Sequence, residues 1–237
     1  PMESLFGGAS QNTIIEPKPR EYPEWTPKQR LDKEKEVLNF YISGHPLESY
    51  SPIVNSLSTI VLSDNESNLI GGKVRICGMF SKVTNKFDRN NKPIAFAEIE
   101  DFTGKAECVF WNNSYESNKN NIIQDSVVMC IGTSDTDGNK IKVIVDEVYP
   151  IAEAAQKFAK GVQIWINLEK ISQEQIIQFY NLCTDNEAKL PVVFNVFDKS
   201  QKYKMNYLAE DVNLSLDETN LNNVIKIFGR HSIRFII

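Results

Sequence analysis

Apolar and polar residues alternate with a period of two from Gly72 to Pro150, and this pattern most constrains the fold. The segments KVRICGMFSKV, IAFAEIED, KAECVFW, DSVVMCIGTSD and IKVIVDEVYPI are each typical of a short, half-buried strand. Polar turns separate most of them, and the connector NNSYESNKNNI favours a helix. We therefore expect five antiparallel strands with a helix between the third and fourth.

That order of elements is typical of an OB-fold β-barrel, which closes its own sheet edges and needs little other support. We assign the OB-fold domain to residues 71–150. The predicted fold class is therefore a mixed α/β, multi-module chain, in which this barrel follows a helical segment and precedes a small α/β domain.

The segments that flank the barrel differ in pattern. Residues 1–26 combine several prolines with polar residues and show no packing period, which predicts a flexible linker. Residues 27–70 form a helical segment, in which Thr26 is the expected N-cap and Gly44 ends the first helix. Residues 161–237 alternate between strand and helix patterns without a glycine-rich phosphate loop, which predicts a small α/β domain.

Composition excludes several classes of protein. The formal net charge of −5 argues against indiscriminate coating of nucleic acid, which requires many Lys and Arg contacts to phosphates. The four cysteines form no CxxC pair and there are two histidines, so we expect no metal site and no cofactor. The absence of a signal-peptide pattern and of a long apolar run predicts a cytoplasmic chain with reduced thiols. Its first and last residues suggest a piece of a longer chain.

The predicted loop between the first two strands gathers basic residues around an aromatic ring. Single-stranded nucleic acid is bound by this combination, because cations follow the phosphates and rings stack on bases. The alternative is a solvated hairpin tip with Phe87 packed against the barrel. The charge of the barrel is nearly balanced, so we expect weak binding. The candidate DNA-binding residues are Lys82, Lys86, Phe87, Arg89, Lys92, Phe96 and Phe110.

Three strings resemble a known family, the α subunit of bacterial DNA polymerase III. LDKEKEVLNFYISGHPLESY is similar to the signature EKE-x-LG-FY-ISGHPL-x-Y that precedes the OB domain of that family, with Asn39 where Gly is usual. NKPIAFAEIEDFTG resembles the pattern GKPMAF-x-x-x-ED-x-TG, and VFWNNSYE resembles VF-P-x-x-YE, with Trp111 at a frequent Pro. The resemblance covers nearly the whole chain and implies the C-terminal region of a replicative polymerase subunit.

In that family a QxxLF-type peptide that binds the sliding clamp β precedes the signature helix. The string MESLF occupies this position, with Met2 in place of the Gln. Leu5 and Phe6 would fill an apolar pocket on the clamp, and the linker would supply reach. The alternative is a short contact with a neighbouring domain. The resemblance implies a clamp-binding segment made of Met2, Ser4, Leu5 and Phe6.

The resemblance also implies that the last domain docks the τ subunit of the clamp loader. The aspartates that hold metal in the family would lie upstream, so we assign no catalytic residue to this chain. The parent protein would be a DNA-directed DNA polymerase, a nucleotidyltransferase, and this part would bind single-stranded template during DNA replication.

Two alternatives remain open at this point. An enzyme could place its active site in the α/β domain, where Asp198, Lys199 and Asp211 are scattered turn residues. A stand-alone OB-fold protein could bind transfer RNA or another RNA, although the acidic balance and the polymerase-like strings count against it.

Overall fold

The fold is described from a computed structural model. The chain contains two compact units. One ends at Ser43, and the other runs from Gly44 to Ile237. Within the described ranges, no helix is long and apolar enough to cross a membrane. The structure describes residues 24–38, 41–63, 71–137, 140–183, 190–198, 204–215 and 218–237.

The first unit contains helix α1 (Pro27–Leu38). Its N-terminus is capped as predicted, because the backbone N–H of Gln29 donates to Thr26 Oγ1 at 3.3 Å. The helix ends earlier than the apolar spacing predicted. The chain beyond it is held by Glu34, whose carboxylate accepts a hydrogen bond from the backbone N–H of Ile42 at 2.7 Å.

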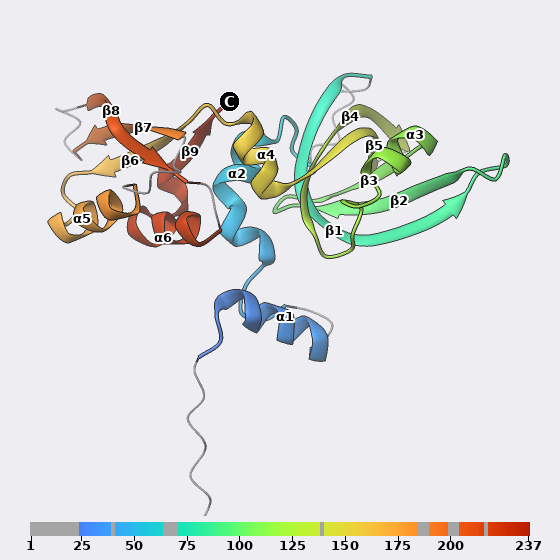
Figure 1. Cartoon of the computed structure of the whole chain (residues 1–237), viewed down its shortest axis with the longest axis horizontal. Coiled ribbons are helices and arrows are strands. Elements are labelled where there is room, and N and C mark those ends of the chain that lie inside the picture. The colour runs from blue at the N-terminus through green and yellow to red at the C-terminus, as the bar shows by residue number, and fades with distance from the viewer. Residues whose placement is uncertain are drawn as a thin grey trace, which may run out of the picture. The chain divides into compact units, whose positions relative to one another are not determined.

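The larger unit contains a closed barrel with the strand order β1-β2-β3-β5-β4, which confirms the predicted OB-fold (Figure 1). Neighbouring strands are antiparallel, except that β3 and β5 pair in parallel to close the barrel. The predicted helical connector lies between β3 and β4. The elements are β1 (Lys73–Phe87), β2 (Pro93–Glu100), β3 (Lys105–Phe110), α3 (Asn112–Asn118), β4 (Val127–Asp137) and β5 (Lys140–Pro150).

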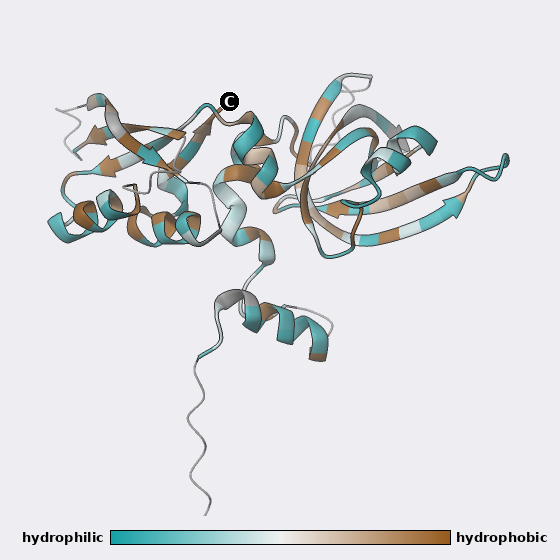
Figure 2. Cartoon of the chain, viewed as in Figure 1, coloured by the Kyte–Doolittle hydropathy of each residue, from teal (hydrophilic) through white to brown (hydrophobic). Residues whose placement is uncertain are grey.

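The inward-facing residues of these strands form the barrel core. Phe80 and Phe110 are fully buried and meet edge to face, with 6.1 Å between ring centroids. Helix α3 is fastened to β5 by Asn118, whose Oδ1 accepts from the backbone N–H of Val148 at 2.8 Å. Figure 2 shows hydrophobic and hydrophilic bands alternating along β1 and β2, as the period of two predicts.

Three hydroxyl groups join the segment before the barrel to both sheets. That segment comprises the 3₁₀ helix η1 (Pro46–Tyr50), helix α2 (Ser51–Leu57) and the two residues that follow it. The backbone N–H of Cys77 in β1 donates to Ser58 Oγ at 3.1 Å, and that of Phe235, near the C-terminus, donates to Ser56 Oγ at 3.0 Å. The third hydroxyl, of Thr59, accepts from the backbone N–H of Arg75 at 2.9 Å.

The C-terminal part is a four-stranded sheet of order β8-β7-β6-β9, in which β6 and β7 are parallel. Helix α5 begins at the predicted capping box of Ser172 and Gln175. The Phe179 ring packs between Phe194 of β7 and Phe228 of α6. The elements are α4 (Ile151–Phe158), β6 (Gly161–Asn167), α5 (Gln173–Leu182), β7 (Leu190–Phe197), β8 (Lys204–Leu214), α6 (Glu218–Phe228), η3 (Arg230–Ser232) and β9 (Ile233–Ile236).

Candidate nucleic-acid interface

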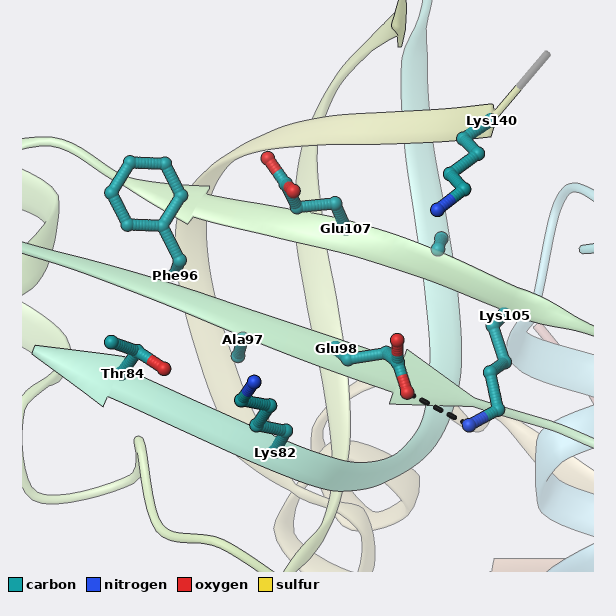
Figure 3. A pocket seen from close by; sticks show the side chains of 9 residues that line it. Lys82, Thr84, Phe96, Ala97, Glu98, Lys105, Glu107 and Lys140 are labelled. Atoms are coloured by element: carbon teal, nitrogen blue, oxygen red, sulfur yellow. Dashed lines mark hydrogen bonds and ion pairs between the residues drawn. The ribbon is translucent and has the colours of Figure 1, made fainter.

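The outward face of β1, β2 and β3 carries a groove of about 340 Å³, which we call the outer groove (Figure 3). Lysines stand on both sides of it, an aromatic ring stands at one end, and two glutamates lie between. The lining residues are Lys82, Thr84, Phe96, Ala97, Glu98, Lys105, Ala106, Glu107 and Lys140.

Strand register brings these side chains together from distant parts of the sequence. Lys82 of β1 pairs with Glu98 of β2, which pairs in turn with Glu107 of β3. Two residues along, Thr84 pairs with Phe96. Because side chains on one strand alternate between faces, these two rows share the outward face of the sheet.

An ion-pair cluster balances part of the charge in the outer groove. Lys105 Nζ lies 2.8 Å from Glu98 Oε1 and 3.2 Å from Glu100 Oε2. The hydrogen bond from Lys105, assisted by one from Ser81 Oγ at 3.0 Å, holds the pKa of Glu98 below its ordinary value. The same pairing raises the pKa of Lys105. The Glu98 carboxylate is therefore ionised and already hydrogen-bonded to the side chains of Lys105 and Ser81.

The aromatic end of the outer groove is set by Phe96, which is partly buried. Lys86 Nζ lies over its ring, 5.3 Å from the centroid. A cation in this position is attracted to the ring face. The sequence predicted both residues as DNA contacts, and the structure brings them together.

The hairpin between β1 and β2 projects three more predicted residues into solvent. Phe87 is 69% exposed, so its ring is not packed against the barrel. Arg89 and Lys92 are exposed on the turn. Asp88 shapes this turn, because its Oδ1 accepts from the backbone N–H groups of Asn90 and Lys92 at 2.8 Å each. The hydrogen bond from Lys92 lowers the pKa of Asp88.

Phe110 is a correction to the predicted set. Its side chain is 0% exposed in the barrel core, where it contacts Phe80, and it offers no face to a base. Conversely, the sequence did not predict that Lys105, Glu107 and Lys140 would line the outer groove. They lie on strands distant in sequence, and only the register between strands places them there.

Most of the other residues that the sequence singled out lie outside the described part of the chain. Met2, Ser4, Leu5 and Phe6 lie outside the described residues. Of the turn residues weighed for an enzyme, Asp198 is described, whereas Lys199 and the Asp211 side chain are not. Within the described ranges, no group of three or more His, Cys, Asp or Glu side chains is placed to hold a metal ion.

Residues 74–151 match a family model described as an OB-fold nucleic acid binding domain. The DNA polymerase III subunit alpha of Borreliella burgdorferi is 28% identical over 94% of this chain and 20% of its own length. That of Aquifex aeolicus is 32% identical over 68% of this chain and 14% of its own length.

A solved asparaginyl-tRNA synthetase from Pyrococcus horikoshii matches at a TM-score of 0.32 and 24% identity, over 39% of this chain and 22% of that one. The curated relatives carry the assignment, although the chain spans a fifth or less of the length of those two. The match confirms the resemblance in the sequence strings: the chain belongs to the bacterial DNA polymerase III α subunit family and corresponds to the C-terminal region of such a subunit.

Proposed function

We propose that this chain is a non-catalytic part of a bacterial replicative polymerase and that its barrel binds single-stranded template DNA in the outer groove. One observation carries the proposal: the partly buried ring of Phe96 lies at the end of a groove that has Lys82 and Lys140 at its edges. Lys86 lies over that ring.

The chemistry of the groove suits a single strand. Lysines at the edges can follow phosphates, and a base can stack on the Phe96 ring, which contributes about 1–3 kcal/mol per base in proteins of this kind. OB-folds bind oligonucleotides over the face of their second and third strands and through the loops joining strands 1 to 2 and 4 to 5. The outer groove occupies that face, and Lys140 follows the second of those loops.

Two carboxylates in the groove limit the affinity. Glu98 and Glu107 repel phosphates, so the net positive charge available to DNA is small. A weak site is nevertheless effective in a tethered arrangement, because the rest of the polymerase would supply a high local concentration of template.

A fluorescent oligo(dT) titrated with the whole chain tests this proposal. We expect binding at low salt that weakens as salt rises, because each phosphate contact releases a counterion and contributes about −0.7 to the slope of log K against log salt. Absence of binding at low salt would contradict the proposal. Tighter binding of oligo(rU) than of oligo(dT) would favour the RNA alternative.

We also propose that the segment formed by Met2, Ser4, Leu5 and Phe6 docks on the sliding clamp. The support is the match of its sequence pattern to a clamp-binding peptide and the pairing of two apolar anchors, Leu5 and Phe6, in a polar segment.

Docking of the C-terminal domain to the clamp-loader τ subunit is the third part of the proposal. Large apolar side chains are exposed on α5 and on the edge strand β8, and exposed side chains of this kind can be buried by a protein partner. The side chains are Ile176, Ile177 and Tyr180 on α5 and Met205, Tyr207 and Leu208 on β8.

A further inference from the structure

The two glutamates of the outer groove are in different situations. Glu98 accepts hydrogen bonds from Lys105 at 2.8 Å and from Ser81 at 3.0 Å. Glu107 is exposed, and its carboxylate makes no hydrogen bond or ion pair with any residue that the structure describes. One carboxylate in the groove therefore keeps its full capacity to accept hydrogen bonds.

Glu107 lies in register between a like charge on β2 and an opposite charge on β5. It is directly opposite Glu98 in the antiparallel pair of β2 and β3. Like charges in opposite positions destabilise a sheet. Its neighbour in register on the other side, Lys142 of β5, makes no ion pair with it, so the carboxylate is available to a ligand.

Glu107 lies next to the aromatic end of the groove. Its partner in register, Glu98, is two residues along β2 from Phe96, which makes Glu107 a diagonal neighbour of the ring. Side chains in diagonal positions are within reach when they are aromatic or long. Figure 3 shows Phe96 and Glu107 projecting from adjacent strands on the same side of the sheet.

A base stacked on Phe96 would present its edge to Glu107. A carboxylate only accepts hydrogen bonds, so it favours a base edge that carries an amino group. Cytosine offers its N4 amino group to Glu or Asp, whereas thymine and uracil carry a carbonyl oxygen at the same position. The carboxylate would attract the first and repel the others.

We propose that Glu107 makes the outer groove selective for bases with an exocyclic amino group, and for cytosine over thymine or uracil. The inference rests on the proposed binding of single-stranded DNA at this face. The phosphates would follow the lysines at the groove edges, away from the two carboxylates, and the bases would lie over the centre.

The test compares oligo(dC) with oligo(dU), two pyrimidine strands that differ in the amino or carbonyl group at position 4 and in the protonation of N3. Fluorescence anisotropy at pH 7.5 and low salt would measure both affinities for the whole chain and for Glu107→Leu. We expect the whole chain to prefer oligo(dC) by about three- to tenfold, the range for one ordinary net hydrogen bond, because exposure to solvent weakens the contribution of the charge. Glu107→Leu should bring that ratio close to one.

A charge control separates base reading from general repulsion. Glu169 is exposed in the turn after β6, outside the groove. Glu169→Leu removes the same charge and should leave the ratio unchanged. Equal binding of oligo(dC) and oligo(dU) by the whole chain, or an unchanged ratio in Glu107→Leu, would overturn the inference while leaving single-strand binding intact. Failure to bind either strand would overturn the proposed function as well.

Discussion

Lys86 Nζ lies 5.3 Å from the centroid of the Phe96 ring, although the two residues are on opposite strands of a hairpin. The contact places a cation over the face of a partly buried aromatic ring. A phosphate that approaches Lys86 would therefore bring its own base close to Phe96. Charge and stacking are combined at one end of the outer groove.

Replacement of Phe96 by Leu should weaken binding of oligo(dT) by about tenfold, because one stacked base contributes about 1–3 kcal/mol. Anisotropy titrations would measure the change, and circular dichroism would verify that the barrel remains folded. Phe158→Leu is a matched control, since this partly buried ring packs on Tyr149, outside the groove. An equal loss in both variants would argue against a specific role for Phe96.

Gly132 should not tolerate a side chain. It stands at a register shift between β4 and β5, and a Cβ atom there would lie 2.2 Å from the carbonyl oxygen of Ile144. We expect Gly132→Ala to lower the free energy of unfolding by about 1–3 kcal/mol, as overpacking does. Urea denaturation would measure this. In Gly44→Ala the nearest atom is a Glu48 carboxylate oxygen at 3.6 Å, so that variant should lose little stability.

The double variant Leu5→Ala/Phe6→Ala should no longer be retained by immobilised sliding clamp, while the unaltered chain is retained. Apolar anchor residues contribute most of the affinity of such peptides. The double variant Met2→Ala/Ser4→Ala tests whether the other two positions matter, and we expect a smaller loss. Equal retention of the unaltered chain and of Leu5→Ala/Phe6→Ala would contradict the docking proposal.

Ile177→Ser should weaken binding of the clamp-loader τ subunit to the whole chain, because Ile177 is one of the exposed apolar residues on α5. Surface plasmon resonance with purified τ subunit would report the affinity. Ile123→Ser is the matched control, since Ile123 is similarly exposed on the barrel. The proposal for this surface fails if τ binds both variants as tightly as the unaltered chain.

Sequence patterns located the strands better than they located the site. The period of two identified all five barrel strands. The same alternation, applied to β3, would have excluded Phe110 from the predicted DNA contacts. On β3, Ala106, Cys108 and Phe110 share one face, and the first two are small residues suited to a barrel core. An aromatic ring on that same face had to point inward.

Two other differences follow from what local sequence does not encode. The predicted first strand, KVRICGMFSKV, ends at Val83, yet β1 continues to Phe87, because Lys86 and Phe87 pair with Ile94 and Pro93 of β2. The placement of Lys105, Glu107 and Lys140 in one groove depends on register across three strands and on closure of the barrel. Single-strand patterns contain no information on register between strands that are distant in sequence.

The salt dependence of oligo(dT) binding to Lys82→Gln/Lys86→Gln tests the central claim most directly. If both lysines contact phosphates, affinity at low salt should fall and the slope of log K against log salt should become shallower by about 1.4, from about 0.7 per contact. The exposed pair Lys160 and Lys170 lies outside the outer groove, so Lys160→Gln/Lys170→Gln should leave the slope unchanged. The same slope in the unaltered chain and in Lys82→Gln/Lys86→Gln would contradict binding in the outer groove.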